Sequence, residues 1–509
     1  MINARFVTRV RVVVLLCILV ALALITKLYY LQVMHGAEYV RVADAQQVDL
    51  QSPLVQRGTI YFSARDGTLL TAATLQDLST ASSTEHQRYY PGGSLAAHAL
   101  GFVAYNNDNE QKGRYGLERY YEQTLARGGG DSYSNFFVEL FGGFAGAFSG
   151  TGGGQGDLIT TIEPSVQSEL ERTLVGYAGL WHPALAGGII MDPHTGEIVA
   201  MATLPTFDLN TFNLEKGTAV FKNPQVESVY EMGSIIKPLT VAAGLDSGTI
   251  TEATTYDDTG CVTLDQKKIC NFDLKARGII PMQEILSQSL NVGSAFVATK
   301  MGPTVFREYF LDRYKLGTET GIDLPGELHG LVKNLQSPRQ VEYATAAFGQ
   351  GIAITPIETV CALSALGNGG LLVTPHLVRA VKYDNGVTRS LSWGEGEQVL
   401  KPETSTAISR MLTKVVDTTL ANGTLKMEHY SLAAKTGTAQ IADPDNGGYY
   451  ADRYLHSFFG YVPSYDPKFI VFLFAVEPTG ASFSSQTWAA PFGGLIKFLI
   501  HYYSIPPDR

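Results

Sequence analysis

The hydrophobic pattern first separates a strongly apolar stretch near the N-terminus from the rest of the chain. Residues 12–34 carry no charge apart from Lys27, whose long side chain can reach the interface, so the stretch is long enough to span a bilayer. It is preceded by three arginines, Arg5, Arg9 and Arg11. We therefore expect a cytoplasmic segment 1–11, a transmembrane helix 12–34 and an extracytoplasmic remainder. A cleaved signal peptide is the alternative, but no small-x-small cleavage site follows the apolar run.

Polar and then glycine-rich sequence follows this stretch. Residues 35–126 are polar, and their short strand-like runs lie at 57–61, 88–93 and 116–118. The segment 128–156 is rich in glycine and carries five phenylalanines, which favours a hinge between domains. An apolar loop that contacts a membrane protein or the bilayer surface is the second interpretation. The pattern predicts a short, mainly β domain over 35–155.

The region 156–509 combines strand and helix patterns. The strand patterns lie at residues 186–191, 197–202, 432–441, 456–462 and 469–476. The first two flank the turn sequence 192–196, so they predict a hairpin, and an amphipathic helix is expected at 488–502. Strands at both ends of the region with helices between them predict an α+β fold, in which one antiparallel sheet is covered by helices.

Size and charge exclude several functional classes. The 509 residues leave room for two or three domains, and the net charge of -10 comes without a basic stripe, so no nucleic-acid partner is expected. No His-Glu-x-x-His sequence occurs, and none of the ten histidines lies at ligand spacing from another. We therefore expect no metal and no cofactor.

The four cysteines fall into two groups. Cys17 lies in the predicted membrane span and Cys361 in an apolar helical pattern, so both are expected to be packing residues. Cys261 and Cys270 flank a short segment on the predicted extracytoplasmic side. They could close a disulfide across a hairpin or remain free thiols.

A candidate nucleophile lies at the start of a predicted helix. The sequence from Ser234 to Lys237 is the only Ser-x-x-Lys in the chain. Pro238 is tolerated only in the first turn of a helix, so the helix that continues through Leu245 begins near Ser234. Residues three apart share a helix face, so we expect the Lys237 amine beside the Ser234 hydroxyl, where it can serve as its base.

Two further patterns follow in order along the chain. Ser289 and Asn291 form a Ser-x-Asn sequence at the end of a helical stretch, and a Lys-Thr-Gly-Thr sequence occupies 435–438 within the predicted strand 432–441. Taken singly, these residues would be a helix cap, turn residues and a solvated strand lysine. Together, in this order, they resemble the active-site set of penicillin-binding proteins and serine β-lactamases.

The resemblance to class B penicillin-binding proteins covers nearly the whole chain. The matching stretches lie at residues 96–98, 116–118, 230–238, 321–327, 348–356 and 456–463. The sequences at 289–293 and 435–440 resemble the division-type, FtsI-like branch more than the elongation branch. This resemblance implies a penicillin-binding, serine β-lactamase-like transpeptidase domain over 156–509, after a shortened pedestal domain over 35–155.

By this resemblance the chain is a membrane-anchored peptidoglycan D,D-transpeptidase that cross-links stem peptides through an acyl-enzyme on Ser234. Lys237 would be the base, Ser289 would relay a proton to the leaving amine, and Asn291 would hold Lys237 and the substrate amide. Gly437 would let the substrate lie close to its strand. The implied substrate-binding and oxyanion residues are Lys435, Thr436, Gly437 and Thr438. The implied ligands are a D-Ala-D-Ala donor, an amine acceptor and β-lactam inhibitors.

The same resemblance implies partners and a location. A SEDS-type glycan polymerase and divisome membrane proteins would contact the transmembrane helix and the pedestal, and the chain would lie in the cell membrane at the division septum. Two departures bear on the pedestal. Phe62 and Ser63 stand where the family has Asp and Arg, and the segment 67–88 is much shorter than the usual pedestal head.

Three alternatives stay open beside this interpretation. In a membrane-anchored β-lactamase or carboxypeptidase, water would resolve the acyl-enzyme, but no clear Glu-x-x-Leu-Asn motif is present. A catalytically silent divisome scaffold or β-lactam sensor is the second alternative, and the intact set of three motifs argues against it. The third is a transpeptidase of the elongation type.

Overall fold

The computed structural model describes residues 56–77, 86–105, 111–127 and 155–509. The predicted cytoplasmic segment, the transmembrane helix 12–34 and Cys17 lie outside the described residues, as does nearly all of the glycine-rich segment. No helix among the described residues is both long and apolar enough to cross a membrane.

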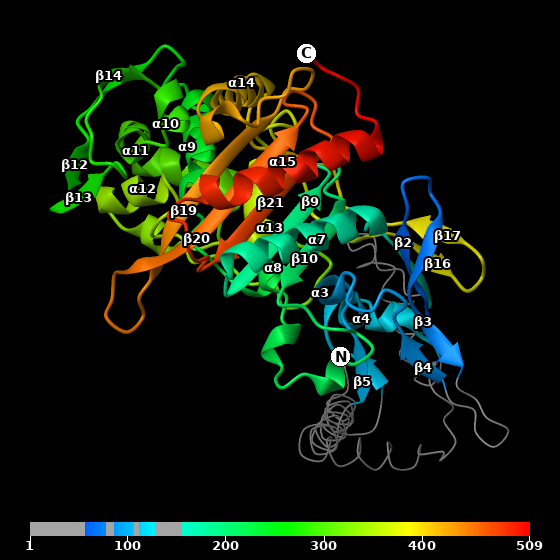
Figure 1. Cartoon of the computed structure of the whole chain (residues 1–509). Helices are drawn as coiled ribbons and strands as arrows, with labels where there is room; N and C mark the ends of the chain where they lie inside the picture. Colours follow the sequence, from blue (N-terminus) through cyan, green and yellow to red (C-terminus); the bar gives the residue numbers. More distant parts are fainter. Residues whose placement is uncertain (1–55, 78–85, 106–110, 128–154) are drawn as a thin grey trace, which may run out of the picture. The chain divides into compact units, whose positions relative to one another are not determined.

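A five-stranded antiparallel sheet forms the centre of the larger region (Figure 1). Its order is β10-β9-β21-β20-β19, with bounds β9 Leu185–Met191, β10 Ile198–Leu204, β19 Ala433–Ala442, β20 Tyr449–Val462 and β21 Phe469–Val476. Strand β21 is apolar at every position and lies in the middle, buried on both faces, as a continuous apolar run predicts. Strands from both ends of the region pair in one sheet, which confirms the predicted arrangement.

Helices cover both faces of this sheet. Successive strand residues point to opposite faces, and on β20 the Phe458 ring stacks on Phe492 of α15 (Ser484–Tyr503), whereas the Tyr461 hydroxyl bonds Ser409 of α14 (Pro402–Thr418). Helix α7 (Pro164–Trp181) packs against α15. The remaining helices of this region are α8 Pro224–Glu227, α9 Lys237–Asp246, α10 Gln283–Ser287, α11 Asn291–Arg307, α12 Gln340–Ala346 and α13 Pro356–Ser364.

A second sheet joins distant parts of the chain. Its order is β17-β16-β8-β2-β3-β4, and β2 and β8 pair in parallel. The bounds are β2 Ile60–Ser63, β3 Leu69–Asp77, β4 His86–Tyr89, β8 Gly156–Thr160, β16 Val378–Tyr383 and β17 Thr388–Ser390. Strands from both predicted domains share this sheet. The sheet therefore does not mark a domain boundary at residue 156, and that boundary stays a prediction.

Short elements complete the N-terminal part. They are β1 Gln56–Arg57, β5 Val103–Tyr105, β6 Gln111–Gly113, β7 Ala126–Arg127, α3 Ala97–Leu100, α4 Gly116–Tyr120 and α5 Glu122–Leu125. The strand expected at 116–118 is therefore wrong, because these residues begin helix α4. Glu118 of α4 and Glu122, the first residue of α5, both accept hydrogen bonds from Arg57.

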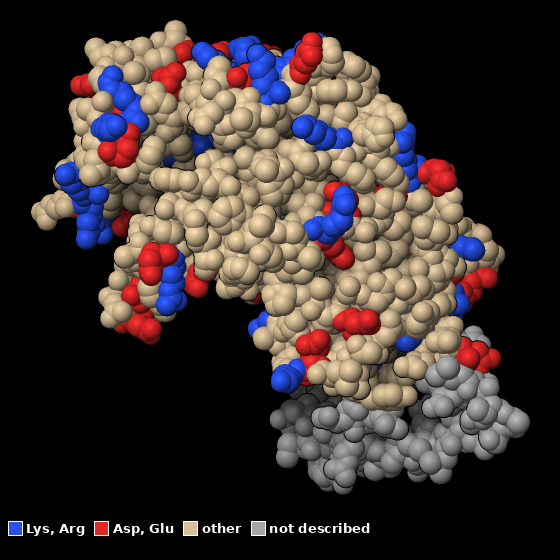
Figure 2. Space-filling model, viewed as in Figure 1, with Lys and Arg blue, Asp and Glu red and all other residues tan. Residues whose placement is uncertain are grey.

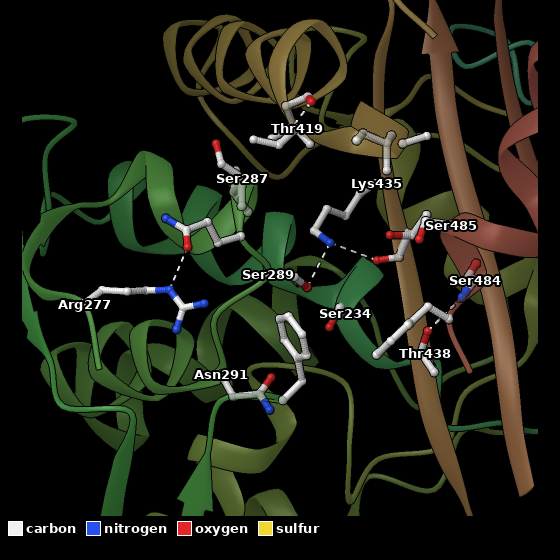
Figure 3. Close-up of a pocket in the computed structure, with 18 residues that line it drawn as sticks. Ser234, Arg277, Ser287, Ser289, Asn291, Thr419, Lys435, Thr438, Ser484 and Ser485 are labelled. Atoms are coloured by element: carbon white, nitrogen blue, oxygen red, sulfur yellow. Dashed lines mark hydrogen bonds between the residues drawn. The ribbon is translucent and has the colours of Figure 1, made fainter. Parts of the chain in front are cut away.

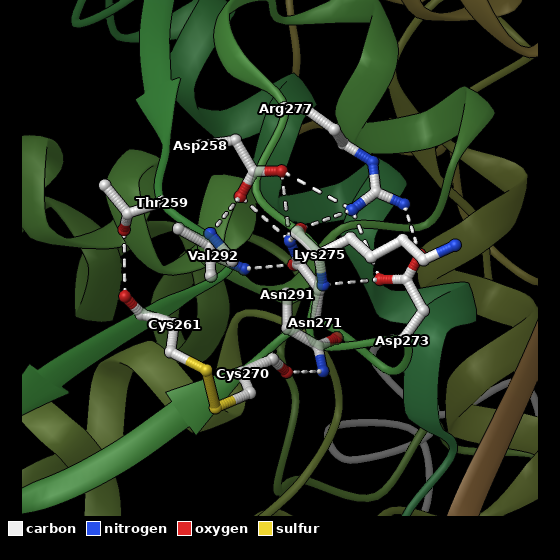
Figure 4. Close-up of a disulfide and its surroundings, with 11 residues drawn as sticks. Asp258, Thr259, Cys261, Cys270, Asn271, Asp273, Lys275, Arg277, Asn291 and Val292 are labelled. Atoms are coloured by element: carbon white, nitrogen blue, oxygen red, sulfur yellow. Dashed lines mark hydrogen bonds and ion pairs between the residues drawn. A yellow bond between two sulfur atoms is a disulfide. The ribbon is translucent and has the colours of Figure 1, made fainter.

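Small hairpins project beside the main sheet. Strand β11 (Thr255–Asp258) pairs with β14 (Gly278–Pro281), and β12 (Cys261–Leu264) pairs with β13 (Lys267–Cys270). Cys261 and Cys270 lie opposite each other and form a disulfide, which answers the question that the sequence left open (Figure 4). A further short pair joins β15 (Leu371–Leu372) to β18 (Glu397–Gln398). On the face shown in Figure 2, basic and acidic side chains are interspersed.

Candidate active site

The start of the serine helix lies against the edge strand β19. A 3-10 turn over Gly233–Ile236 leads directly into α9, so the helix begins where Pro238 predicts. Gly233 has a φ of 66°, and a Cβ there would lie 2.9 Å from the Thr438 carbonyl oxygen. Only glycine allows both this backbone conformation and this approach, so Gly233 brings Ser234 next to the strand.

A cleft of about 460 Å³ opens along β19 (Figure 3). The predicted residues that line it are Ser234, Ser289, Asn291, Lys435, Thr436 and Thr438. Lys237 does not line the cleft and is completely buried. Gly437 lies against the start of the serine helix, since a Cβ there would lie 2.3 Å from Ser457 Oγ and 2.6 Å from the Met232 carbonyl oxygen. Gly437 therefore makes room for the chain before Ser234.

Two lysine amines meet at one serine. Lys237 Nζ donates to the Ser289 carbonyl oxygen and lies 3.2 Å from Ser289 Oγ. Lys435 Nζ lies 3.0 Å from the same hydroxyl and 2.9 Å from the Thr436 carbonyl oxygen. Ser289 has a φ of 56°, which is uncommon for a residue with a side chain and is typical of functional sites. This conformation turns both its carbonyl and its hydroxyl towards the lysines.

Burial makes these amines unusually weak bases. It lowers the pKa of Lys237 well below the ordinary value, and the nearby charge of Lys435 lowers it further. Burial also lowers the pKa of Lys435, to about 7. The described residues that line the cleft include no aspartate or glutamate. A neutral amine can therefore exist here near neutral pH, which is what a general base requires.

Two expected contacts are not formed. The Asn291 amide donates to the Cys270 carbonyl oxygen at 2.9 Å and does not bond Lys237, whose amine is directed to Ser289. The Ser234 hydroxyl lines the cleft without a hydrogen bond to either lysine in the described part of the chain. The structure thus brings Ser234, Lys237, Ser289 and Lys435 to one place, but it connects Asn291 to the disulfide hairpin.

The sequence did not reveal how this hairpin supports the site. Buried Asn271 bonds the Asp258 carboxylate through its amide nitrogen at 2.8 Å and accepts from the Val292 backbone at 3.1 Å (Figure 4). Arg277 closes the same loop with an ion pair to Asp273 at 2.9 Å. The adjacent cysteine pair was the only sequence signal for this support. Across the described ranges, no three His, Cys, Asp or Glu side chains are grouped so that they could hold a metal ion.

The fold and this site together define the class of protein. Residues 186–494 match the family model of the penicillin binding protein transpeptidase domain, and the chain belongs to that family. It is 32% identical over 419 residues to Stage V sporulation protein D of Bacillus subtilis, covering 80% of this chain and 63% of the relative. It is 25% identical to peptidoglycan D,D-transpeptidase FtsI of Escherichia coli, covering 83% of this chain and 68% of the relative. The chain therefore spans less than two thirds of the length of the sporulation protein.

Solved structures show the same fold. The crystal structure of penicillin binding protein 3 from Mycobacterium tuberculosis in its apo form superposes with a TM-score of 0.77 at 23% identity. The match covers 90% of this chain and 98% of that one. The complex of that protein with aztreonam gives the same TM-score.

Proposed function

We propose that this chain is a peptidoglycan D,D-transpeptidase that cross-links stem peptides through an acyl-enzyme on Ser234. The observation that carries the proposal is the pair of buried lysine amines that contact the Ser289 hydroxyl, beside the cleft that Ser234 lines. Two similarities support it: the Escherichia coli relative is named a peptidoglycan D,D-transpeptidase, and the Mycobacterium tuberculosis neighbour has been crystallised with ampicillin and aztreonam.

Acylation begins with the neutral amine of Lys237. This amine takes the proton of Ser234 while Ser234 Oγ attacks the carbonyl of the penultimate D-alanine. The partial positive charge at the N-terminus of the serine helix favours the developing alkoxide. The backbone N–H groups of Ser234 and Thr438 would bind the oxyanion, and one such donor is typically worth about 2.7–4 kcal/mol in the transition state.

Ser289 is the proposed proton relay. Its hydroxyl lies within hydrogen-bonding distance of both lysine amines, so a proton gained by Lys237 can pass through Ser289 to the departing nitrogen of D-alanine. Cleavage of the peptide bond leaves an ester on Ser234. An acceptor amine then attacks this ester, gives up a proton to the same lysine and forms the new amide, and Ser234 regains its hydrogen.

The strand residues would bind the donor. Protonated Lys435 attracts the terminal carboxylate, and the Thr436 and Thr438 hydroxyls can donate to it. The Asn291 amide nitrogen donates one hydrogen to the Cys270 carbonyl, so its second hydrogen and its oxygen could bind the substrate amide. Gly437 lets the chain before Ser234 approach β19. That Gly437 also lets the substrate lie close to its strand stays part of the proposal.

Location and partners belong to the same proposal. We place the chain in the cell membrane through the predicted helix 12–34, with its catalytic region outside and at the division septum. A SEDS-type glycan polymerase would supply the glycan strands, and divisome membrane proteins would contact the helix and pedestal. The support is the resemblance of the motifs at 289–293 and 435–440 to the division-type branch.

Covalent labelling of the purified full-length chain with a fluorescent penicillin tests the proposed function. Label that persists on the parent and on Ser247→Ala, an exposed serine at the far end of α9, but is absent from Ser234→Ala would support it. Label that decays within minutes would indicate hydrolysis by a β-lactamase or carboxypeptidase. A folded parent that takes no label would favour the silent scaffold.

A further inference from the structure

A second hollow adjoins the catalytic cleft. Figure 3 shows Lys435 towards one end of the cleft and Thr438 towards the other. Ala421 and Ser485 line the cleft, and both also line a separate hollow of about 570 Å³. Leu432, which comes just before strand β19, lines this hollow as well, so the hollow continues from the Lys435 end of the cleft.

This hollow, called the side groove below, lies between helix α15 and the turn that follows α14. Its lining includes Leu425, Lys426, Met427, Ala490, Gly494 and Lys497. The turn passes through Ala421 and Asn422, whose φ angles of 47° and 55° are uncommon for residues with side chains. On the helix side, a Cβ at Gly494 would meet no atom within 4 Å. The groove therefore has an apolar turn on one side and open space over the helix.

Two lysines give the side groove a positive charge. Lys426 and Lys497 are exposed, and neither forms an ion pair with another described residue. No aspartate or glutamate of the described ranges lines the groove. Two acidic residues flank the turn in the sequence, but Asp417 is paired with Arg509 at 2.7 Å, and the side chain of Glu428 is 87% exposed. The charge of the groove therefore favours a ligand that carries carboxylates.

The second half of the proposed reaction needs a place for the acceptor. The acceptor nitrogen forms the new amide bond while the ester bond to Ser234 Oγ breaks, and one proton of the amine passes to Ser234 Oγ. This step is acylation run in reverse with a different amine, so the acceptor nitrogen has to take the position that the nitrogen of D-alanine left. The acyl part of the donor still occupies the Thr438 end of the cleft. The rest of the acceptor must therefore leave the cleft past Lys435, where the side groove begins.

We propose that the side groove binds the acceptor stem peptide, with carboxylates of the peptide at Lys426 and Lys497. The inference rests on the proposed function and names the class of acceptor: an amine on a peptide that carries carboxylates away from the reacting nitrogen. A stem peptide whose glutamate is linked through its side chain keeps a free α-carboxylate, and its C-terminus adds another. None of the three sequence motifs contains a residue of this groove.

The test measures how the acyl-enzyme of the full-length chain is divided between water and an acceptor. The donor is a depsipeptide that ends in D-Ala-D-lactate, because the released lactate has no amine that could return. One acceptor is D-alanine, which fills only the leaving-group position. The other is the N-acetylated tetrapeptide L-Ala-γ-D-Glu-X-D-Ala, with lysine or meso-diaminopimelate as X. We would measure the ratio of aminolysis to hydrolysis against the concentration of each acceptor.

Gly494→Leu fills the side groove. Leucine favours a helix more than glycine does, and a Cβ at this position meets nothing, so the variant should fold. Aminolysis by the tetrapeptide should fall about tenfold to a hundredfold, because its amine is no longer positioned. Acylation and aminolysis by D-alanine should stay within about twofold of the parent. Gly176→Leu is the matched control, because this exposed glycine of α7 also has open space at its Cβ and should keep the parental ratio.

Lys426→Gln and Lys497→Gln test the charges of the groove. Each should lower the preference for the tetrapeptide over its diamide about twofold to fivefold, the range expected for an exposed ion pair. Lys222→Gln removes an exposed lysine that lines neither the cleft nor the groove, and it should leave this preference unchanged.

Tetrapeptide aminolysis that survives Gly494→Leu, or aminolysis by both acceptors that falls in parallel, would overturn the side groove as the acceptor site. So would a parent that uses D-alanine but neither tetrapeptide. A preference for the acid over the diamide that persists when both lysines are replaced would overturn the carboxylate contacts. A parent that forms the acyl-enzyme on Ser234 but passes it only to water would instead overturn the proposed transpeptidation, and the side groove with it.

Discussion

Two of the buried charge clusters in the described part of the chain are built in opposite ways. In the N-terminal part, the Glu118 carboxylate accepts hydrogen bonds from Arg57 Nε and Arg88 Nε, each at 2.7 Å. All three residues are buried. Burial alone would raise the pKa of Glu118, but the charges of Arg88 and Arg57 outweigh it and hold this pKa below its ordinary value. At the catalytic site, Lys237 and Lys435 are also buried, but neither has a carboxylate partner among the described residues.

The first cluster stabilises the fold, whereas the second can take part in a reaction. A buried ion that is paired and hydrogen-bonded stays charged and fixes the fold around it, and removing its partner is costly. A buried amine without a counter-charge gives up its proton easily and becomes a base. Burial beside two arginines keeps Glu118 charged, whereas burial beside another lysine makes Lys237 a reactive base. Titratable groups whose pKa values are perturbed in this second way are typical of functional sites.

Loss of Lys237 should produce the largest change. In Lys237→Met, we expect acylation by penicillin to fall by about 10²–10⁴-fold, because the general base is gone. Stability should not fall. The lowered pKa of Lys237 means that the folded chain disfavours its charge at every pH below the unfolded value of about 10.4, and methionine removes that penalty. Stopped-flow acylation and thermal unfolding at neutral pH measure both effects. A variant that unfolds at a clearly lower temperature would contradict the contrast between the clusters.

Loss of Glu118 should have the opposite profile. Glu118→Gln leaves two guanidinium groups buried without their shared carboxylate, so we expect the free energy of unfolding to drop by about 3–5 kcal/mol. The fraction that remains folded should be acylated at the parental rate. Glu122→Gln is the control, because this carboxylate is 27% exposed and should contribute less than about 1 kcal/mol. Denaturant unfolding checks both values, and equal losses in the two variants would refute the role of the buried pair.

The pH dependence of acylation tests whether the buried Lys435 loses its charge near neutral pH. Burial lowers the pKa of Lys435 to about 7, so above that pH the lysine loses the charge that attracts the substrate carboxylate. The second-order acylation constant should fall as pH rises through this value, up to about tenfold per pH unit. Lys435→Arg keeps its charge and should lack this alkaline decline, whereas Lys382→Arg, on an exposed strand position, should retain it. A decline that persists in Lys435→Arg would assign the titration to another group.

The disulfide should have the smallest effect. In the double variant Cys261→Ala and Cys270→Ala, the carbonyl that accepts the Asn291 amide loses its covalent support. A single neutral hydrogen bond is worth about 0.5–1.5 kcal/mol, so acylation should slow by roughly twofold to tenfold. Single-turnover kinetics of the oxidised parent and the variant provide the measurement. Unchanged acylation would show that the backbone pairing of β12 with β13 positions Asn291 by itself.

Sequence patterns alone predicted the residues that meet beside β19 and much of the fold. The order of the three motifs predicted the residues that meet at β19, Pro238 predicted where the serine helix begins, and the apolar runs predicted the central strands. These features depend on the spacing of apolar residues and on the backbone properties of single residues. Both can be read from a short stretch of sequence. The order of these elements, with strands at both ends of the region and helices between them, also predicted one shared sheet.

Individual side-chain contacts between distant segments could be seen only in the folded protein. Residues 116–118 are helical, and Glu118 contacts Arg57, which lies far away in the sequence. Asn291 bonds the disulfide hairpin, and Gly437 makes room for Met232, because each is fitted to a surface that another part of the chain supplies. The side groove has the same origin, since its two walls come from segments far apart in the sequence. A local sequence pattern carries no information on how distant segments pack. It therefore cannot show which remote group a side chain will contact.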